Sequence, residues 1–186
     1  MTWGLFAAAL LTGVAVLAAV LQSWLRPAWR VWPPGRRGWR HALMWALFVG
    51  FSLSEFALAV CDYNALAERG LAWSAAWRWP IGLAPIVAGN LLAWWGAATL
   101  SPAATAGLEH RLVEAGPYRF SRNPQYVGNV LILVGVGVIA HSPLVWLALA
   151  PVVAACLVAP WAEEPWCAER YGEPYQEYRR RVRRFL

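Results

Sequence analysis

Five long apolar segments constrain the fold of this chain more than any other feature of its sequence. Each is close to the length of about 20 residues that an α-helix needs to cross a hydrocarbon core ~30 Å thick. Only 14% of the residues are charged, against roughly 25% in soluble domains, so a soluble fold could not bury this much apolar surface. We therefore expect an all-α, polytopic integral membrane protein with about five transmembrane helices, at residues 3–25, 41–61, 80–100, 124–140 and 144–161.

The 16 basic residues, all of them arginine, are distributed unequally among the connections between these helices. Arg69 and Arg78 lie in the second connection, and all the others follow the first helix, precede the fourth or occupy the tail. Because positively charged connections remain in the cytoplasm, we expect the N-terminus outside and the C-terminus in the cytoplasm. Arginine without lysine is also typical of a GC-rich bacterial genome, so the expected location is the bacterial inner membrane.

The net charge of +6 and the isolated cysteines and histidines limit the partners to be expected. The basic residues border apolar segments instead of forming one stripe, so anionic membrane lipids are the expected partner and nucleic acid is not. The three cysteines and three histidines lack the spacing typical of a metal site. We therefore expect no metal ion.

Most of the polar residues that could form a site lie in two segments, residues 114–126 and residues 163–186. The turn at residues 141–143 is too short for anything but an antiparallel hairpin of the fourth and fifth helices, and this hairpin brings the two segments together. In the tail, apolar residues recur at intervals of three or four, which predicts a C-terminal amphipathic helix at the membrane interface. Gly172 and Pro174 predict a helix end followed by a restart.

Together the two segments place carboxylates, an arginine, an amide and phenols around one cleft at the membrane surface. Carboxylates accept hydrogen bonds from hydroxyl and ammonium groups, and arginine binds a carboxylate. Such a cleft suits a ligand with a positive centre, a ribose, an α-amino acid end and an adenine. Taken singly, the residues have plainer interpretations: Arg122 as a positive-inside anchor, and Glu163 and Glu164 as the solvated end of the fifth helix.

The order and spacing of these residues also carry a family resemblance. The chain resembles the isoprenylcysteine carboxyl methyltransferase and phospholipid methyltransferase family in four motifs: Gly116-Pro117-Tyr118, Arg122-Asn123-Pro124-Gln125-Tyr126-Val127-Gly128, Glu163-Glu164, and Tyr171-Gly172 with Tyr175 and Tyr178. The chain has no internal repeat or linker, so we expect one domain over residues 1–186. Three N-terminal helices would occupy residues 1–104, and residues 105–186, which the resemblance covers, would form the catalytic half.

The resemblance implies that S-adenosylmethionine binds in a pocket between the two segments, open to the cytoplasm, while a lipophilic acceptor enters from the bilayer. It implies Arg122 and Glu164 as catalytic residues. By matching position, the cofactor-binding residues would be Gly116, Pro117, Tyr118, Arg122, Asn123, Pro124, Tyr126, Gly128, Glu163 and Glu164. The family usually has histidine where this chain has Asn123; an amide cannot titrate near neutral pH, which favours cofactor binding over a general-base role.

The acceptor stays open between a carboxylate, an amine and a thiol, and a small lipid or hydrophobic metabolite is our preferred interpretation. A carboxylate or thiolate arrives ionised or nearly so, whereas an amine needs a base such as Glu163 or Glu164. Two other functions remain open. The C-terminal portion of sterol reductases resembles the same two segments, which would imply reduction with NADPH, and a membrane scaffold could retain the fold without catalysis.

Overall fold

The computed structural model describes residues 1–71, 73–108 and 111–185, most of which lie in helices. In chain order the helices are α1 (Thr2–Leu25), η1 (Pro27–Trp29), α2 (Trp39–Cys61), α3 (Ala65–Glu68), α4 (Ala75–Thr99), α5 (Pro102–Thr105), η2 (Gly116–Arg119), α6 (Pro124–Ala140), α7 (Pro143–Tyr171) and α8 (Glu173–Arg181). Within the described part, α1, α2, α4 and α7 are long and apolar enough to cross a membrane, and α6 is a shorter apolar helix of 17 residues. The expected all-α, polytopic membrane architecture is confirmed.

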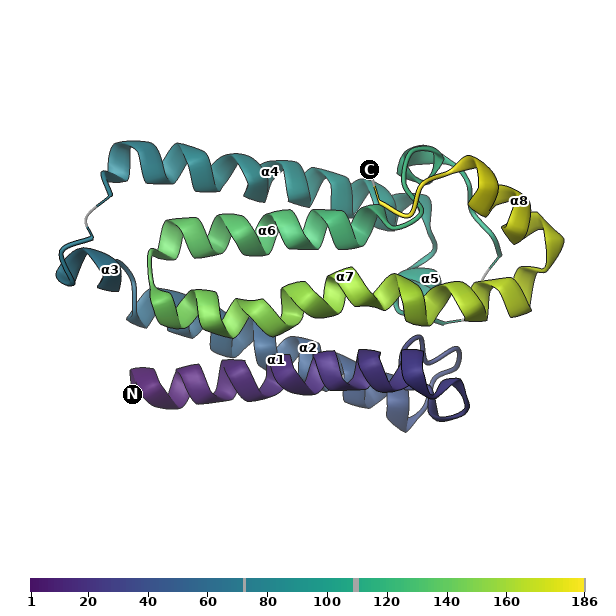
Figure 1. Ribbon diagram of the computed structural model, residues 1–186, viewed down its shortest axis with the longest axis horizontal. Helices are drawn as coiled ribbons and strands as arrows, with labels where there is room; N and C mark the ends of the chain where they lie inside the picture. Colours follow the sequence, from purple (N-terminus) through teal and green to yellow (C-terminus); the bar gives the residue numbers. More distant parts are fainter. Residues whose placement is uncertain (72, 109–110, 186) are drawn as a thin grey trace.

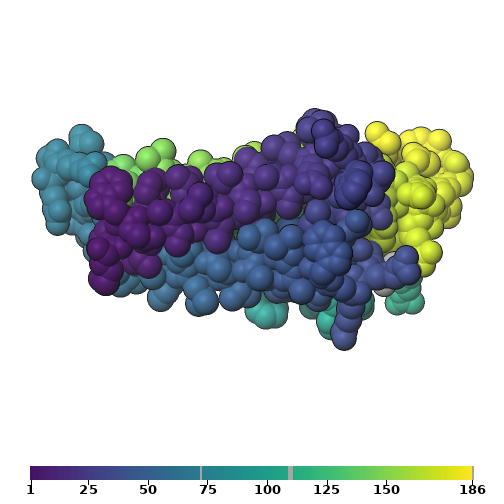
Figure 2. All heavy atoms as spheres, turned by 90° about the horizontal axis from the view of Figure 1, so that it is seen from below, coloured from purple at the N-terminus to yellow at the C-terminus, as the bar shows by residue number. Residues whose placement is uncertain are grey.

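The five long helices run along the molecule, and α6 and α7 lie in its middle. α4 packs against α6, α6 against α7, and α7 against α1, which in turn packs against α2. Figure 1 shows the N-terminus and α3 at one end of the bundle, and α5 and α8 at the opposite end, which we call the site end. α1 and α2 together cover one face of the molecule (Figure 2). The site ends of α6 and α7 are therefore enclosed by the outer helices and by the tail.

Helices α4 and α6 approach each other so closely that their backbones touch. Gly82 and Gly89 on α4 face Gly135 and Gly128 on α6, in antiparallel order and with a spacing of seven residues on each helix. A Cβ atom built on Gly128 would lie 2.6 Å from the carbonyl oxygen of Gly89, and one built on Gly82 would lie 2.9 Å from that of Gly135. Since small residues let helices approach closely in lipid, these glycines fix the position of α6 against α4.

A Gly89→Ala substitution is therefore expected to destabilise the protein by about 1–3 kcal/mol, because the new methyl group collides with the backbone of Gly128. Gly50→Ala on α2 is the matched control, since the nearest atom to its Cβ would be a Thr12 methyl group at 3.6 Å. Unfolding by denaturant in detergent micelles measures both variants. Equal stability of the two would contradict the close contact between α4 and α6.

Helix α7 is longer than the sequence predicted. The prediction ended it at residue 161, ahead of the carboxylates, but it continues to Tyr171 with Pro151, Pro160 and Pro165 inside it. Gly172 then adopts a φ of 61°, which ends α7, and Pro174 lies in the first turn of α8, so the expected stop and restart is confirmed. Glu163 and Glu164 consequently lie within a helix and are not its solvated end.

The N-terminus and the C-terminal helix α8 lie at opposite ends of the bundle, which agrees with an odd number of crossings (Figure 1), while the side of the membrane that each end faces stays a prediction. In a background without Cys61, Cys156 and Cys167, a Thr2→Cys variant should react with an impermeant maleimide from outside the cell. A Leu186→Cys variant should react only after the membrane is permeabilised. Labelling of both positions from the same side would reject five crossings.

Candidate functional site

A cavity of about 520 Å³ lies among α2, α6, α7 and α8 and continues from the site end into the apolar bundle. Its polar half contains Arg122 and Glu164 with the tyrosines of α8. Its apolar half is formed by Phe51 on α2, Leu133 on α6, and Val152 and Cys156 on α7. These α7 residues precede Glu164 by two to three helical turns, roughly 12–18 Å along the axis. One cavity therefore joins a charged region at the site end to an apolar region deeper in the helix bundle.

The apolar half reaches the outer surface beside α2. Trp45 and Ser52 line the cavity there, and both are exposed residues in the bundle. Trp45 is 42% exposed although it lines the cavity. Because this surface belongs to a membrane-spanning helix, the opening beside Trp45 and Ser52 faces the region that lipid would occupy.

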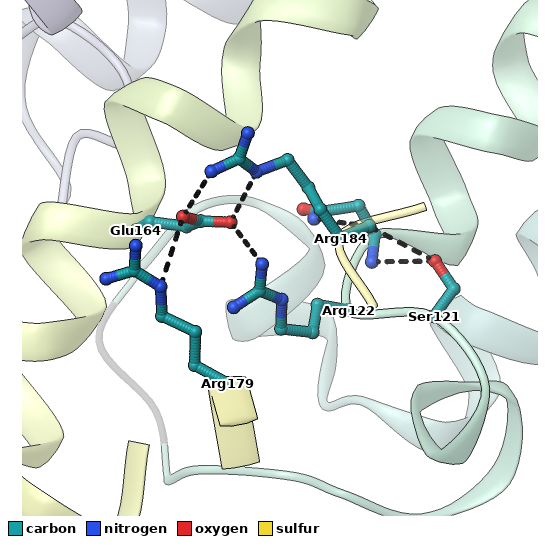
Figure 3. A network of polar contacts seen from close by, with 6 residues as sticks. Ser121, Arg122, Glu164, Arg179 and Arg184 are labelled. Carbon is teal, nitrogen blue, oxygen red and sulfur yellow. Dashed lines mark hydrogen bonds and ion pairs between the residues drawn. The ribbon is translucent and has the colours of Figure 1, made fainter. Parts of the chain in front are cut away.

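Glu164 is surrounded by guanidinium groups, as Figure 3 shows. Arg122 Nη2 lies 2.9 Å from its Oε1, and Arg184 donates from Nε at 2.7 Å to Oε1 and from Nη2 at 2.8 Å to Oε2. Arg179 lies further away, at 3.9 Å. The Glu164 side chain is only 9% exposed. These hydrogen bonds raise the pKa of Arg184 above its usual value.

Arg122 lines the cavity and has spare hydrogen-bonding capacity. Its side chain is 8% exposed, and its Nε and Nη1 atoms are buried without a hydrogen-bond partner among the described residues. Buried donors of a charged group that stay unpaired are costly. An anionic ligand with oxygen acceptors, such as a carboxylate, would satisfy them.

Glu163 points to different partners from its neighbour, because successive residues of an α-helix are about 100° apart. The Tyr126 hydroxyl donates to Glu163 Oε1, and the indole Nε1 of Trp32 lies 2.6 Å from the same oxygen and 2.8 Å from the Tyr126 hydroxyl. Trp32 comes from the loop between η1 and α2, in the half of the chain whose sequence carries no motif. The two glutamates thus belong to two separate polar networks.

Asn123 connects the site to the C-terminal tail. Its side-chain amide donates to the Arg184 carbonyl at 2.9 Å, and its backbone N–H donates to Ser121 Oγ at 3.1 Å. The Arg122 backbone N–H donates to the Arg183 carbonyl at 2.9 Å. Asn123 therefore fixes the segment that delivers Arg184 to Glu164.

The turn before α6 is closed by α8. Tyr118 in η2 accepts a hydrogen bond at its hydroxyl from Gln125, 2.9 Å away, and at its carbonyl from the Tyr178 hydroxyl, 2.8 Å away. Burial raises the pKa of Tyr178 above its usual value, so the phenol keeps its proton and its role as donor. The expected amphipathic helix of the tail exists, and its buried face, Tyr175 and Tyr178, forms a wall of the cavity.

The residues expected from the sequence fall into two groups. Six of them line the cavity: Tyr118, Arg122, Asn123, Tyr126, Glu163 and Glu164. The other four support its walls instead: Gly116, Pro117, Pro124 and Gly128. Gly128 faces α4, as described above, and Gly116 adopts a φ of 56° in the turn, where a Cβ atom would collide with Thr99. Trp32 and Arg184 were not among the residues expected at the site, although Arg184 lies in the second of the two polar segments.

The region that contains most of the site matches a known protein family. The profile of the phospholipid methyltransferase family matches residues 77–174, just over half of the chain. The chain belongs to the phospholipid methyltransferase family. The match runs from α4 to the start of α8 and leaves out α1, α2 and Arg184. Neither the curated proteins nor the solved structures compared with the chain include a match.

Membership of the phospholipid methyltransferase family makes the chain a membrane methyltransferase, in agreement with its apolar helices. The matched region supplies Arg122, Tyr126 and both glutamates of the cavity. The unmatched region supplies Trp32 and the α2 wall of the apolar half. The cavity of this family member is thus built partly from residues that lie outside the family match.

Proposed function

We propose that the protein transfers a methyl group from S-adenosylmethionine to a lipophilic acceptor, a carboxylate, amine or thiol, at the cytoplasmic surface of the membrane. The observation that carries the proposal is the single cavity that joins the polar half, with Arg122 and Glu164, to an apolar half beside α2. A water-soluble charged donor and an apolar acceptor have opposite solvation requirements. One cavity with two halves of opposite character satisfies both.

The polar half fits the cofactor. S-adenosylmethionine, when bound, supplies a methyl group on a positively charged sulfonium sulfur. The unpaired donors of Arg122 would bind its carboxylate, and Glu164 would hold that guanidinium in place through their 2.9 Å ion pair. The aromatic rings of Tyr175 and Tyr178, which line the same half, can stabilise a cationic centre.

The apolar half suits the acceptor. An acyl or prenyl chain could reach it from the bilayer through the opening beside Trp45 and Ser52. The reactive end would then lie near Glu163, which lines the cavity one residue before Glu164. An amine acceptor has to lose a proton, and Glu163 is a better candidate base than Glu164, whose oxygens are occupied by arginines. Positioning and exclusion of water supply the remaining acceleration.

Binding measurements test the cofactor and separate the alternatives. Calorimetry on the purified protein in detergent should detect S-adenosylhomocysteine binding and no binding of NADPH. Binding of NADPH alone would favour a sterol-reductase-like enzyme, and binding of neither would favour a non-catalytic scaffold.

Asn123→His tests whether this position acts through hydrogen bonding alone. A histidine can donate to the Arg184 carbonyl as the amide does, so S-adenosylhomocysteine affinity should be retained. The pH profile of methyl transfer should show no new step near ~6.5, the usual histidine pKa. Asn123→Leu, which has a similar size and no donor, is the control and should bind the cofactor more weakly. A new step near that pH would assign the position a proton-transfer role.

A further inference from the structure

The indole of Trp32 lies in the polar network of Glu163, although it is more than 90 residues away in the sequence from both of its partners. It belongs to the loop between η1 and α2, outside the family match at residues 77–174. Neither the family nor the sequence motifs assign it a role.

Trp32 is held rigidly from several directions. Ser23, on α1 and 1% exposed, accepts hydrogen bonds from the backbone N–H groups of Val31 at 3.0 Å and Trp32 at 2.9 Å. The Phe48 ring packs edge-on against the indole, with ring centroids 5.7 Å apart. On the remaining side, Gly107 approaches so closely that a Cβ atom there would lie 2.9 Å from the indole ring. The position of the Trp32 N–H is therefore set by α1, α2 and the loop after α5.

The rigid indole fixes one oxygen of Glu163. Its N–H points at Glu163 Oε1 and at the Tyr126 hydroxyl, and that hydroxyl in turn donates to Oε1. Among the described residues, every hydrogen bond to Glu163 ends on Oε1. Oε2 is left for a ligand in the cavity that Glu163 lines.

We propose that Trp32 is a positioning residue that, together with Tyr126, holds Glu163 by its Oε1 so that Oε2 serves the acceptor. Glu164, held by Arg122 and Arg184, serves the cofactor. The inference rests on the proposed methyl transfer for the role of Oε2, and it assigns the N-terminal half of the chain a part in the reaction. Acceptor chemistry and cofactor binding then depend on different glutamates.

Trp32→Phe removes the indole N–H and keeps an aromatic ring against Phe48. With membrane lipid extract as acceptor and methyl-labelled S-adenosylmethionine as donor, the turnover rate should fall by about tenfold, the effect of one lost hydrogen bond. The affinity for S-adenosylhomocysteine should stay unchanged. Trp29→Phe is the matched control, since this exposed tryptophan lies three residues away and outside the cavity.

A double-mutant cycle separates positioning from a general structural effect. Trp32→Phe should cause little further loss of turnover in a Glu163→Gln background, because both changes disrupt one network. In a Glu164→Gln background, the fold-loss of turnover caused by Trp32→Phe should multiply with the fold-loss caused by Glu164→Gln. Losses that multiply in both backgrounds would overturn the assignment to Glu163.

Labelling with dicyclohexylcarbodiimide gives a readout that needs no substrate. This apolar reagent modifies carboxyl groups in membrane proteins, and peptide mass spectrometry can compare Glu163 with Glu55, a buried carboxyl on α2 that has no hydrogen-bond partner among the described residues. Trp32→Phe should raise labelling of Glu163 relative to Glu55, and Trp29→Phe should not. Unchanged labelling overturns the inference. Increased labelling in a protein that transfers no methyl group supports the positioning and rejects only the proposed function.

Discussion

Replacing Arg122 by alanine is expected to lower the affinity for S-adenosylhomocysteine by about 30-fold or more, since truncating one partner of a buried charge pair costs about 2–5 kcal/mol. Two losses combine in this variant. In the proposed complex the carboxylate of the ligand would lose the donors at Nε and Nη1, and Glu164 loses its ion pair at 2.9 Å. Calorimetry in detergent measures the affinity directly.

Arg183→Ala is the control for Arg122→Ala, because it removes the same charge from an exposed side chain and leaves the backbone carbonyl that binds Arg122 intact. Its S-adenosylhomocysteine affinity should equal that of the parent. If the two variants lose affinity equally, only the overall positive charge matters and Arg122 has no specific contact with the ligand.

Glu164→Gln is expected to destabilise the folded protein by about 3 kcal/mol, as for a buried ion pair that loses one partner. The substitution leaves Arg122 and Arg184 close together without a carboxylate between them. Their repulsion should release the tail, because Arg184 is held there by two hydrogen bonds to Glu164. Chemical unfolding in detergent gives the free energy, and limited trypsin digestion reports on the tail.

Glu173→Gln provides the comparison for Glu164→Gln. Glu173 also pairs with an arginine, Arg180, at 2.8 Å, but both side chains are more than 60% exposed. Exposed pairs contribute about 0–1 kcal/mol, so this variant should unfold like the parent and keep its tail protected. A Glu164→Gln variant that is equally stable would show that the buried cluster does not hold the tail.

The apolar segments allowed the helices to be predicted well because hydrophobic length is a local property. The error at α7 has a physical cause. Glu163 and Glu164 looked like the point where a membrane helix must end, since charge is costly in an apolar environment. In the folded protein Arg122 and Arg184 offset that cost at Glu164. Trp32 and Tyr126 donate hydrogen bonds to Glu163, and all four partners come from other segments. A single segment contains no information about such compensation.

The site was predictable as far as its residues lie in the hairpin of α6 and α7. Arg122, Tyr126 and the two glutamates meet because the turn at His141 returns the chain within a few residues. Trp32 and the α2 wall were not predictable in this way, because their loop shows no periodicity that would orient it. The different directions of Glu163 and Glu164 follow from helical geometry and became evident only with the true length of α7.

Transfer of a labelled methyl group to a lipid-soluble product tests the central claim most directly. Membranes that contain the parent protein should convert methyl-labelled S-adenosylmethionine into a labelled product that extracts into organic solvent and is identified by mass spectrometry. Membranes with Arg122→Ala should form little of it, and membranes with Arg183→Ala should form as much as the parent. A parent protein that forms no more labelled product than membranes lacking it would contradict the proposed function.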